Sequence, residues 1–335
     1  MKKTNFIGID VSKKTLDICL VQGNKVVHLM KILNTKQALK KAFSVLKKEF
    51  LVDSDNTLCC MEYTGIYNYL LLEFLWANRY QIWLERAVQI KQSSGISRGK
   101  SDELDASRIA FYAYKNQQDC KYWEPEREQI ITLKSLLSTR NRLIKVQKQL
   151  SVPLKEAQGF VDKKTIKLNK DLAQQPLNAI ETAIVKAEQQ IVALIKEDEN
   201  LKRLFFLIKS VDGVGPVVAA NIIAKTNEFK NYTEARKFAC YSGVAPFPHS
   251  SGSSIRGRAK VSHMANKTMK TLMHLAAMAA INTKGELGQY YQRKVQEGKN
   301  KMNVINAVRN KIIARIFAVV KRNEPYQKIL QNSLA

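Results

Sequence analysis

The first 115 residues alternate between strand-like and helix-like segments in an order that restricts the fold more than any other feature of the chain. Three short runs rich in apolar and β-branched residues come first, separated by tight polar turns, which is typical of an antiparallel meander. Segments with helical apolar spacing then alternate with two further short runs. The expected strands are residues 5–11, 15–21, 25–31, 57–61 and 81–85, and the expected helices are residues 35–50, 66–77 and 102–115.

This order, βββαβαβα, predicts a mixed sheet with flanking helices and antiparallel first hairpins. That arrangement is the RNase H-like (RuvC-like) plan, an α/β fold in which the first and fourth strands are neighbours. Beyond Pro125 the spacing becomes helical, so the fold class is α/β followed by a mainly helical part. A chain of 335 residues is too long for one ordinary core, and three domains are expected: residues 1–125, 126–200 and 201–335.

Four acids fall on parts of this plan that should meet. Asp10 lies near the end of the first expected strand, and Glu62 directly follows the fourth. Asp102 and Asp105 share one helical face, with Cβ atoms about 5–6 Å apart. Because grouped carboxylates repel one another, the pattern predicts a site for two Mg²⁺ ions about 3.5–4 Å apart that activate an oxygen nucleophile for phosphodiester cleavage. A hydrogen-bonded structural role is the alternative for Asp10, since an unpaired carboxylate is costly to bury.

The formal net charge of +26 predicts a polyanionic partner, nucleic acid before an anionic membrane. Half of this charge lies in residues 251–335, which hold 16 Lys and Arg against 3 acids, whereas residues 1–125 hold 19 against 13. We therefore expect a basic DNA grip towards one end and an acidic centre towards the other. A soluble basic protein with solvated lysines is the alternative.

Residues 126–200 have the spacing of a helical hairpin. Apolar residues between Ile180 and Leu194 alternate by fours and threes, which is heptad spacing. A long helix after Pro125, a connecting tip at about residues 156–175 and a second helix starting at Pro176 are expected. The pattern fits an antiparallel hairpin or a coiled coil with another protomer, and equally an ordinary helical pair within one domain.

Compartment signals favour the cytosol. The chain has five cysteines, without Cys-x-x-Cys or zinc spacing, which indicates reduced thiols. Its first residues pass directly into a strand, so no signal peptide is expected. Lysines interrupt the most apolar helical segment, residues 264–281, and no membrane span is expected.

Two later motifs are candidates for contact with DNA. The turn at residues 211–215 (VDGVG) resembles a helix-hairpin-helix, in which Gly213 and Gly215 expose backbone N–H groups to a phosphate; the alternative is a packing corner. The Pro/Ser/Gly-rich loop expected at residues 245–257 is either a flexible phosphate-binding loop or the source of a hydroxyl nucleophile stabilised by arginines. The candidate nucleic-acid contacts are Arg98, Lys100, Gly213, Gly215, Arg256, Arg258, Lys260, Lys267 and Lys270.

Taken in order, these motifs resemble the DEDD transposases of bacterial insertion sequences, a family related to Piv-type DNA invertases. The resemblance extends from Phe6 to about Arg322. No single motif is specific, but the ordered set is. The matching segments are residues 8–13 (GIDVSK), 62–67 (EYTGIY), 98–106 (RGKSDELDA), 211–215 (VDGVG) and 243–246 (GVAP), with Ser251-Gly252.

The resemblance implies a RuvC-like nuclease domain, a coiled-coil segment and a C-terminal transposase domain in a bacterial, cytoplasmic, nucleoid-associated enzyme. It implies that the four acids bind Mg²⁺ and that Ser251 attacks DNA to form a covalent phosphoserine link. That serine would work with an acidic site of another protomer, in a dimer or tetramer. It also implies a structured noncoding guide, the bridge RNA, which pairs with the double-stranded DNA of both the element ends and the target.

The chain departs from the family pattern at several positions. Ser101 stands where members often have Thr, and Ala265 where many have Gly before Asn. Lys270 replaces an Arg, which keeps the charge but loses the bidentate fork. Ser250 adjoins Ser251, so the nucleophile could be either serine.

Three functions are therefore compared. The first is a transposase or site-specific recombinase that uses the acids and a serine. The second is a Holliday-junction-type endonuclease that uses the four acids alone. The third is a non-enzymatic nucleic-acid binder with a vestigial sheet. The long C-terminal third favours the first over the second, and the presence of all four acids argues against the third.

Overall fold

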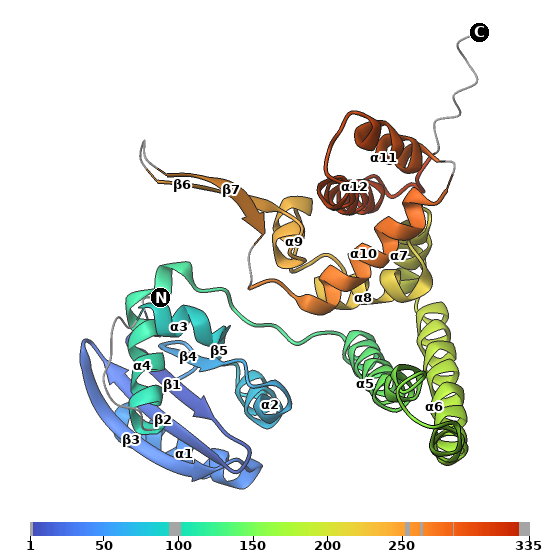
Figure 1. The fold of residues 1–335 in the computed structure, drawn as a ribbon. Coiled ribbons are helices and arrows are strands. Elements are labelled where there is room, and N and C mark those ends of the chain that lie inside the picture. The colour runs from blue at the N-terminus through green and yellow to red at the C-terminus, as the bar shows by residue number, and fades with distance from the viewer. Residues whose placement is uncertain (1–2, 94–101, 252–254, 262–263, 284, 328–335) are drawn as a thin grey trace. The chain divides into compact units, whose positions relative to one another are not determined.

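The computed structural model describes residues 3–93, 102–251, 255–261, 264–283 and 285–327. The chain divides into two compact units, Met1–Pro125 and Glu126–Ala335 (Figure 1). Each unit has its own hydrophobic core. Within the described ranges, no helix has the length and apolar content needed to cross a membrane.

The first unit is built on a five-stranded mixed sheet with the order β3-β2-β1-β4-β5. The meander β1–β2–β3 is antiparallel, whereas β4 pairs parallel to both β1 and β5. This order and these directions are those of the RNase H-like plan, which confirms the predicted fold class. The strands are β1 (Asn5–Val11), β2 (Thr15–Gln22), β3 (Lys25–Leu33), β4 (Thr57–Glu62) and β5 (Gln81–Glu85). The helices are α1 (Lys36–Phe50), α2 (Tyr69–Ala77), α3 (Ala87–Ser93) and α4 (Asp102–Lys115), with a 3₁₀ turn, η1 (Gly65–Asn68), before α2 and another, η2 (Gln117–Asp119), after α4.

Alternation along the strands distributes apolar side chains between two layers of helices. Ile7 and Ile9 of β1 pack with residues of α1 and α2, such as Phe43 and Leu71. Phe6, the neighbour of Ile7, belongs instead to the cluster that includes α3 and α4. Strands β1, β2 and β4 are therefore buried on both faces, because side chains at alternate positions of a strand point to opposite faces, whereas the edge strand β3 is largely exposed.

Helix α4 approaches the sheet closely at Gly8. A Cβ atom at Gly8 would lie 2.2 Å from the carbonyl oxygen of Ala106 and 2.2 Å from the backbone nitrogen of Ala110. Any side chain here would push α4 away from β1, because its contacts are with backbone atoms. The glycine therefore fixes the distance between the sheet and the helix that carries two of the candidate acids.

Gly8→Ala is accordingly expected to destabilise the first unit by about 3 kcal/mol through overpacking. The three tryptophans, Trp76, Trp83 and Trp123, all lie in this unit, so tryptophan fluorescence during denaturant unfolding reports on it specifically. Gly23→Asn is the matched control. Gly23 occupies an open left-handed turn position (φ +59°) that Asn tolerates. Equal unfolding midpoints for Gly8→Ala and the wild type would contradict the close approach.

The second unit is mainly helical, with one small hairpin. Its core joins residues of α7, α8, α9, α10 and α12, among them Leu204, Ile222, Phe238, Met273 and Ile312. The elements are α5 (Glu128–Glu156), α6 (Lys163–Glu197), α7 (Glu199–Lys209), α8 (Pro216–Thr226), α9 (Ala235–Tyr241), β6 (Pro246–Ser251), β7 (Ile255–Val261), α10 (Lys267–Ile281), α11 (Glu286–Gln296) and α12 (Lys301–Arg322).

Helices α5 and α6 pack against each other as the expected hairpin (Figure 1). Its connection is much shorter than predicted, because α6 begins at Lys163 and continues through Pro176. Asp162 caps the helix by accepting a hydrogen bond from the Thr165 backbone N–H at 2.9 Å. Proline inside a helix removes the hydrogen bond from its own nitrogen and crowds the carbonyl of the preceding turn, but α6 continues through it. The prediction that the helix starts at Pro176 was therefore wrong.

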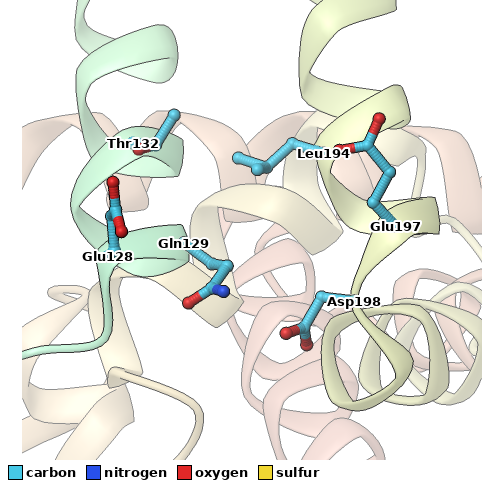
Figure 2. Close-up of a pocket in the computed structure, with 6 residues that line it drawn as sticks. All are labelled: Glu128, Gln129, Thr132, Leu194, Glu197 and Asp198. Carbon is cyan, nitrogen blue, oxygen red and sulfur yellow. The ribbon is translucent and has the colours of Figure 1, made fainter.

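A charged network holds the base of this hairpin to the core. Arg127 donates hydrogen bonds to Asp198 and, at 2.7 Å, to the buried carboxylate of Glu228. Beside this network, a hollow of about 260 Å³ lies between α5 and α6 (Figure 2). Its lining is acidic for so basic a chain, but it belongs to the second unit and contains none of the four candidate acids. It is lined by Glu128, Gln129, Thr132, Leu194, Glu197 and Asp198.

Candidate active site

Asp10 and Glu62 end neighbouring parallel strands. The register between β1 and β4 runs from Asn5 opposite Thr57 to Ile9 opposite Met61, so Asp10 and Glu62 directly follow the last pair of this register. Each lies two residues beyond a residue that faces α4: Gly8 contacts the backbone of that helix, and Cys60 belongs to its apolar cluster. By strand alternation, both carboxylates lie on the α4 face of the sheet.

Helix α4 crosses this face with its N-terminus towards the acids. The Phe6 ring packs against Tyr114 near the end of the helix, with ring centroids 5.3 Å apart. Gly8, one pleat further along β1, meets Ala106 and Ala110. The next pleat is Asp10, so the first turn of α4 lies over that end of the strand. Asp105 and the backbone of Asp102 belong to this turn.

Glu62 experiences the other carboxylates directly. Burial raises the pKa of its side chain, and the negative charges of Asp10 and Asp105 raise it further. Asp105 also accepts a hydrogen bond from Arg108 Nη1 at 2.7 Å, which fixes its orientation. The structure therefore brings Asp10, Glu62 and Asp105 together, whereas the Asp102 side chain lies outside the described residues.

These oxygen donors suit a hard divalent cation. Carboxylates are the ligands that Mg²⁺ prefers, and a cation would relieve the repulsion that raises the Glu62 pKa. Among the side chains that the structure describes, no three Asp, Glu, His or Cys groups meet closely enough to hold an ion. The described trio is therefore a loose group of like charges and not a closed metal cage.

Asp17 is a fifth acid at this end of the sheet that the sequence reasoning did not identify. It lies opposite Asp10 in the antiparallel register of β1 and β2. Its side chain is buried and forms an ion pair with Lys31 Nζ of β3 at 3.3 Å. The available signal was the one that identified Asp10, an acid inside an apolar strand. Asp17 sits between Leu16 and Ile18, both of which are fully buried.

The serine segment forms a hairpin and not the loop that was expected. Ser251 is the last residue of β6 and pairs with Ile255, and Ser250 pairs with Arg256. The sequence reasoning missed these strands because the segment lacks alternating apolar residues, although backbone pairing needs none. Arg256, Arg258 and Lys260 lie on β7. The side chains of both serines and of these three basic residues, like Arg98 and Lys100 altogether, lie outside the described residues.

The turn between α7 and α8 combines a packing corner with an open helix start. Gly213 has φ +84°, and its α-carbon faces α10, where an added Cβ would lie 2.3 Å from the Ala276 carbonyl oxygen. Gly215 is the N-cap residue of α8 and has nothing within 4 Å of an added Cβ. In the first turn of α10, Lys267 is exposed and Lys270 is half-buried.

Two family models match the chain. A DEDD transposase model of the IS110 type, described as "Transposase", matches residues 7–157. A model described as "Transposase IS116/IS110/IS902 family" matches residues 206–292. Together they cover more than two thirds of the chain in the expected order. The chain belongs to the IS110 family of DEDD transposases. Its enzyme class is therefore DNA transposase or recombinase, which cleaves and rejoins DNA strands.

Curated relatives of this IS110-family transposase match along nearly its whole length. The "Pilin gene-inverting protein" of Moraxella bovis is 24% identical over 98% of this chain and 99% of that protein. The "Transposase for insertion sequence element IS1111A" of Coxiella burnetii is 22% identical over 98% of this chain and 92% of that protein. Among solved structures, T. thermophilus RuvC in complex with a Holliday junction is similar over 35% of the chain, with 13% identity and a TM-score of 0.28.

Proposed function

We propose that this transposase cleaves and rejoins double-stranded DNA at element ends and targets with a site made by Asp10, Glu62, Asp102 and Asp105. The observation that supports the proposal best is geometric: the parallel register of β1 and β4 brings Asp10 and Glu62 to the same end of the sheet, and the first turn of α4, which carries Asp105, lies over that end. Burial, together with the negative charges of Asp10 and Asp105, raises the pKa of Glu62 there. The four carboxylates would hold Mg²⁺, two ions by our inference. Bound Mg²⁺ supplies a Lewis acid that polarises the phosphate and stabilises the leaving oxygen.

Ser251 is proposed as the nucleophile of the exchange step. Its Oγ forms a bond to phosphorus, the phosphorus–oxygen bond of the DNA strand breaks, and the departing deoxyribose oxygen takes a proton. Reversal of this step with a different strand end rejoins the DNA. The alternative function, a Holliday-junction-type endonuclease that uses only the four acids, has no use for a serine. The match of residues 206–292 to a transposase model favours the exchange reaction over that alternative.

The remaining proposed contacts hold the nucleic acid. Arg98 and Lys100 would contact phosphates beside the acids, and the open start of α8 suits a phosphate because backbone N–H groups point out of a helix N-terminus. On the family relationship, we propose that Ser251 works with the acids of another protomer in a dimer or tetramer. Chromosomal DNA as substrate implies action in the bacterial cytoplasm. The contact set is Arg98, Lys100, Gly213, Gly215, Arg256, Arg258, Lys260, Lys267 and Lys270.

A Mg²⁺ titration tests the acidic site. Mg²⁺ is expected to stabilise the first unit by about 2.7 kcal/mol at a concentration of 100 Kd, because the ion binds only the folded site. The measurement is denaturant unfolding followed by tryptophan fluorescence. Glu62→Gln should be insensitive to Mg²⁺. Without metal it should unfold later than the wild type, because burial and neighbouring charges oppose ionisation of Glu62 in the folded state.

Asp55→Asn is the matched control for this titration. Asp55 is exposed and precedes β4, at the opposite end of the strand from Glu62, so this variant should respond to Mg²⁺ as the wild type does. The metal site would be rejected by two results together: an unfolding midpoint of the wild type that does not change with Mg²⁺, and DNA cleavage that persists in EDTA.

A guide RNA is proposed on the family relationship. The transposase purified from its host under mild salt should carry one structured noncoding RNA encoded beside its gene, with segments complementary to element end and target. Sequencing of the co-purified RNA checks this. A variant with Arg256, Arg258 and Lys260 replaced by Gln serves as a comparison for charge-driven binding. Recovery of only bulk cellular RNA from the wild type would argue against a dedicated guide.

A further inference from the structure

The segment that follows Glu62 exposes large side chains beside the acids. Tyr63 is 68% exposed, Ile66 82% and Tyr69 62%, and Tyr67 is also exposed. We call these four residues, which are three tyrosines and Ile66, the aromatic rim. Single exposed apolar residues are common on protein surfaces, but four within seven positions next to a candidate active site form a local patch. No described contact covers the rim within the first unit.

The backbone of the rim is held rigidly by Asn68, which is 1% exposed. Its Nδ2 donates to the Glu62 carbonyl oxygen at 2.9 Å, and its Oδ1 accepts from both the backbone N–H and the hydroxyl of Thr64, at 2.7 and 2.8 Å. The Tyr63 N–H donates to the Glu85 carbonyl of β5 at 3.0 Å. The backbone that carries the exposed tyrosine rings is therefore fixed. The Asn68 side chain also fixes the backbone of Glu62.

The rim is also tied to the Asp10 side of the site. Asn34 Nδ2 donates to the carbonyl oxygens of both Ser12 and Tyr67, each at 3.1 Å. Ser12 lies two residues after Asp10, and Tyr67 belongs to the rim. The Asn34 side chain thus joins the segment that follows Asp10 to the segment that follows Glu62. The fold therefore sets the position of the rim relative to these two acids.

We propose that the aromatic rim stacks against an unpaired nucleobase of the DNA strand whose phosphate lies at the acids. This inference rests on the proposed function and deepens it. Carboxylates repel phosphate, so a strand needs an uncharged source of binding energy close to them, and an aromatic ring supplies it to any base. The net charge is positive both for the whole chain (+26) and for residues 1–125, which hold 19 Lys and Arg against 13 acids, and it favours a polyanion as the occupant over a basic protein surface. Tyr63, next to Glu62 in sequence, is the principal stacking residue.

A comparison of two single strands of equal charge tests the rim. One is a strand of about 12 thymidine nucleotides, and the other has the same phosphates with abasic sites throughout. In EDTA, the wild type should bind the thymidine strand about tenfold more tightly or better, as expected for loss of one stacked base. Tyr63→Ala should lose most of this preference and Tyr63→Phe should keep it. Phe160→Ala, which removes a 91% exposed ring from the second unit, should leave it unchanged.

Photo-crosslinking locates the contact. With 5-iodouracil in the same strand, irradiation should couple DNA to the peptide that contains residues 63–69, and Tyr63→Ala should reduce that yield. Two outcomes would overturn the proposal directly: crosslinks confined to other peptides, or an unchanged preference for the thymidine strand in Tyr63→Ala. Loss of self-association in Tyr63→Ala would also overturn it, because a second copy of the chain would then be the occupant of the rim. Neither measurement needs DNA cleavage, so both can be made on an inactive Asp10→Asn protein. If that protein still prefers the thymidine strand, the stacking proposal stands or falls independently of the proposed chemistry.

Discussion

Replacing Asp10 with asparagine is expected to lower DNA cleavage and strand exchange by at least about a thousandfold, because one of the four carboxylates proposed to bind Mg²⁺ is lost, and with it part of the stabilisation of the transition state. The first unit should remain folded. Asparagine has nearly the same size, and the apolar packing of Ile7 and Ile9 behind the site is untouched. Burial and the charges of Asp10 and Asp105 raise the pKa of Glu62 in the wild type, and removal of the Asp10 charge relieves part of that effect. Nicking and recombination of a supercoiled plasmid that carries the element ends measure the effect.

Two comparisons make this prediction specific. Asp55→Asn removes an acid of the same unit from the other end of the sheet and should cleave like the wild type. Tryptophan fluorescence should show that Asp10→Asn unfolds no earlier than the wild type in the absence of metal. If Asp10→Asn recombines its plasmid at the normal rate, Asp10 does not belong to the active site. Its role would then be structural, as a hydrogen-bonded residue of the strand.

The first unit could be predicted closely because each of its signals is local and strong. The expected strand at residues 81–85 and the expected helix at residues 102–115 have the bounds that β5 and α4 show. Short strands bounded by polar turns leave little freedom in register, since a shift of one residue moves every buried side chain to the wrong face. Helix α3, by contrast, was missed because its seven residues are too few for helical periodicity to be recognised.

The grouping of the acids followed from the same topology. Once β1 and β4 are neighbours and parallel, Asp10 and Glu62 must end side by side, and this could be derived without coordinates. Asp17 could be placed in the same way, because the antiparallel pairing of β1 with β2 sets it opposite Asp10. The hydrogen bonds by which Asn34 and Asn68 fix the rim could not have been predicted, since side-chain hydrogen bonds to backbone carbonyls leave no periodic pattern in the sequence.

The second unit shows where local rules are insufficient. Proline favours the first turn of a helix, so Pro176 predicts a helix start, yet the Asp162 cap starts α6 earlier and the helix passes through the proline. The polar residues of β6 and β7 predict a loop, yet they pair as a hairpin. Both errors arise from the same cause. Backbone hydrogen bonding and capping can define an element when the apolar pattern does not.

Ser251→Ala is expected to abolish strand exchange, by about a thousandfold or more, since loss of a nucleophile removes the covalent step itself. The wild type should form a denaturant-resistant protein–DNA adduct through that serine, and the variant should form none. Gel electrophoresis of labelled element ends under denaturing conditions measures the adduct. Ser250→Ala is the matched control, because the two serines occupy successive positions of β6 opposite Arg256 and Ile255.

The pair of serine variants also decides between the two chemistries. If Ser251→Ala recombines normally while Ser250→Ala does not, the nucleophile is displaced by one residue, and the hairpin still supplies it. If neither substitution affects cleavage while Asp10→Asn abolishes it, the four acids act alone, as in a junction endonuclease. Only a loss of exchange in both Asp10→Asn and Ser251→Ala supports the composite site. In that case, mixing the two inactive variants should restore partial activity, because one protomer can then supply the acids and another the serine.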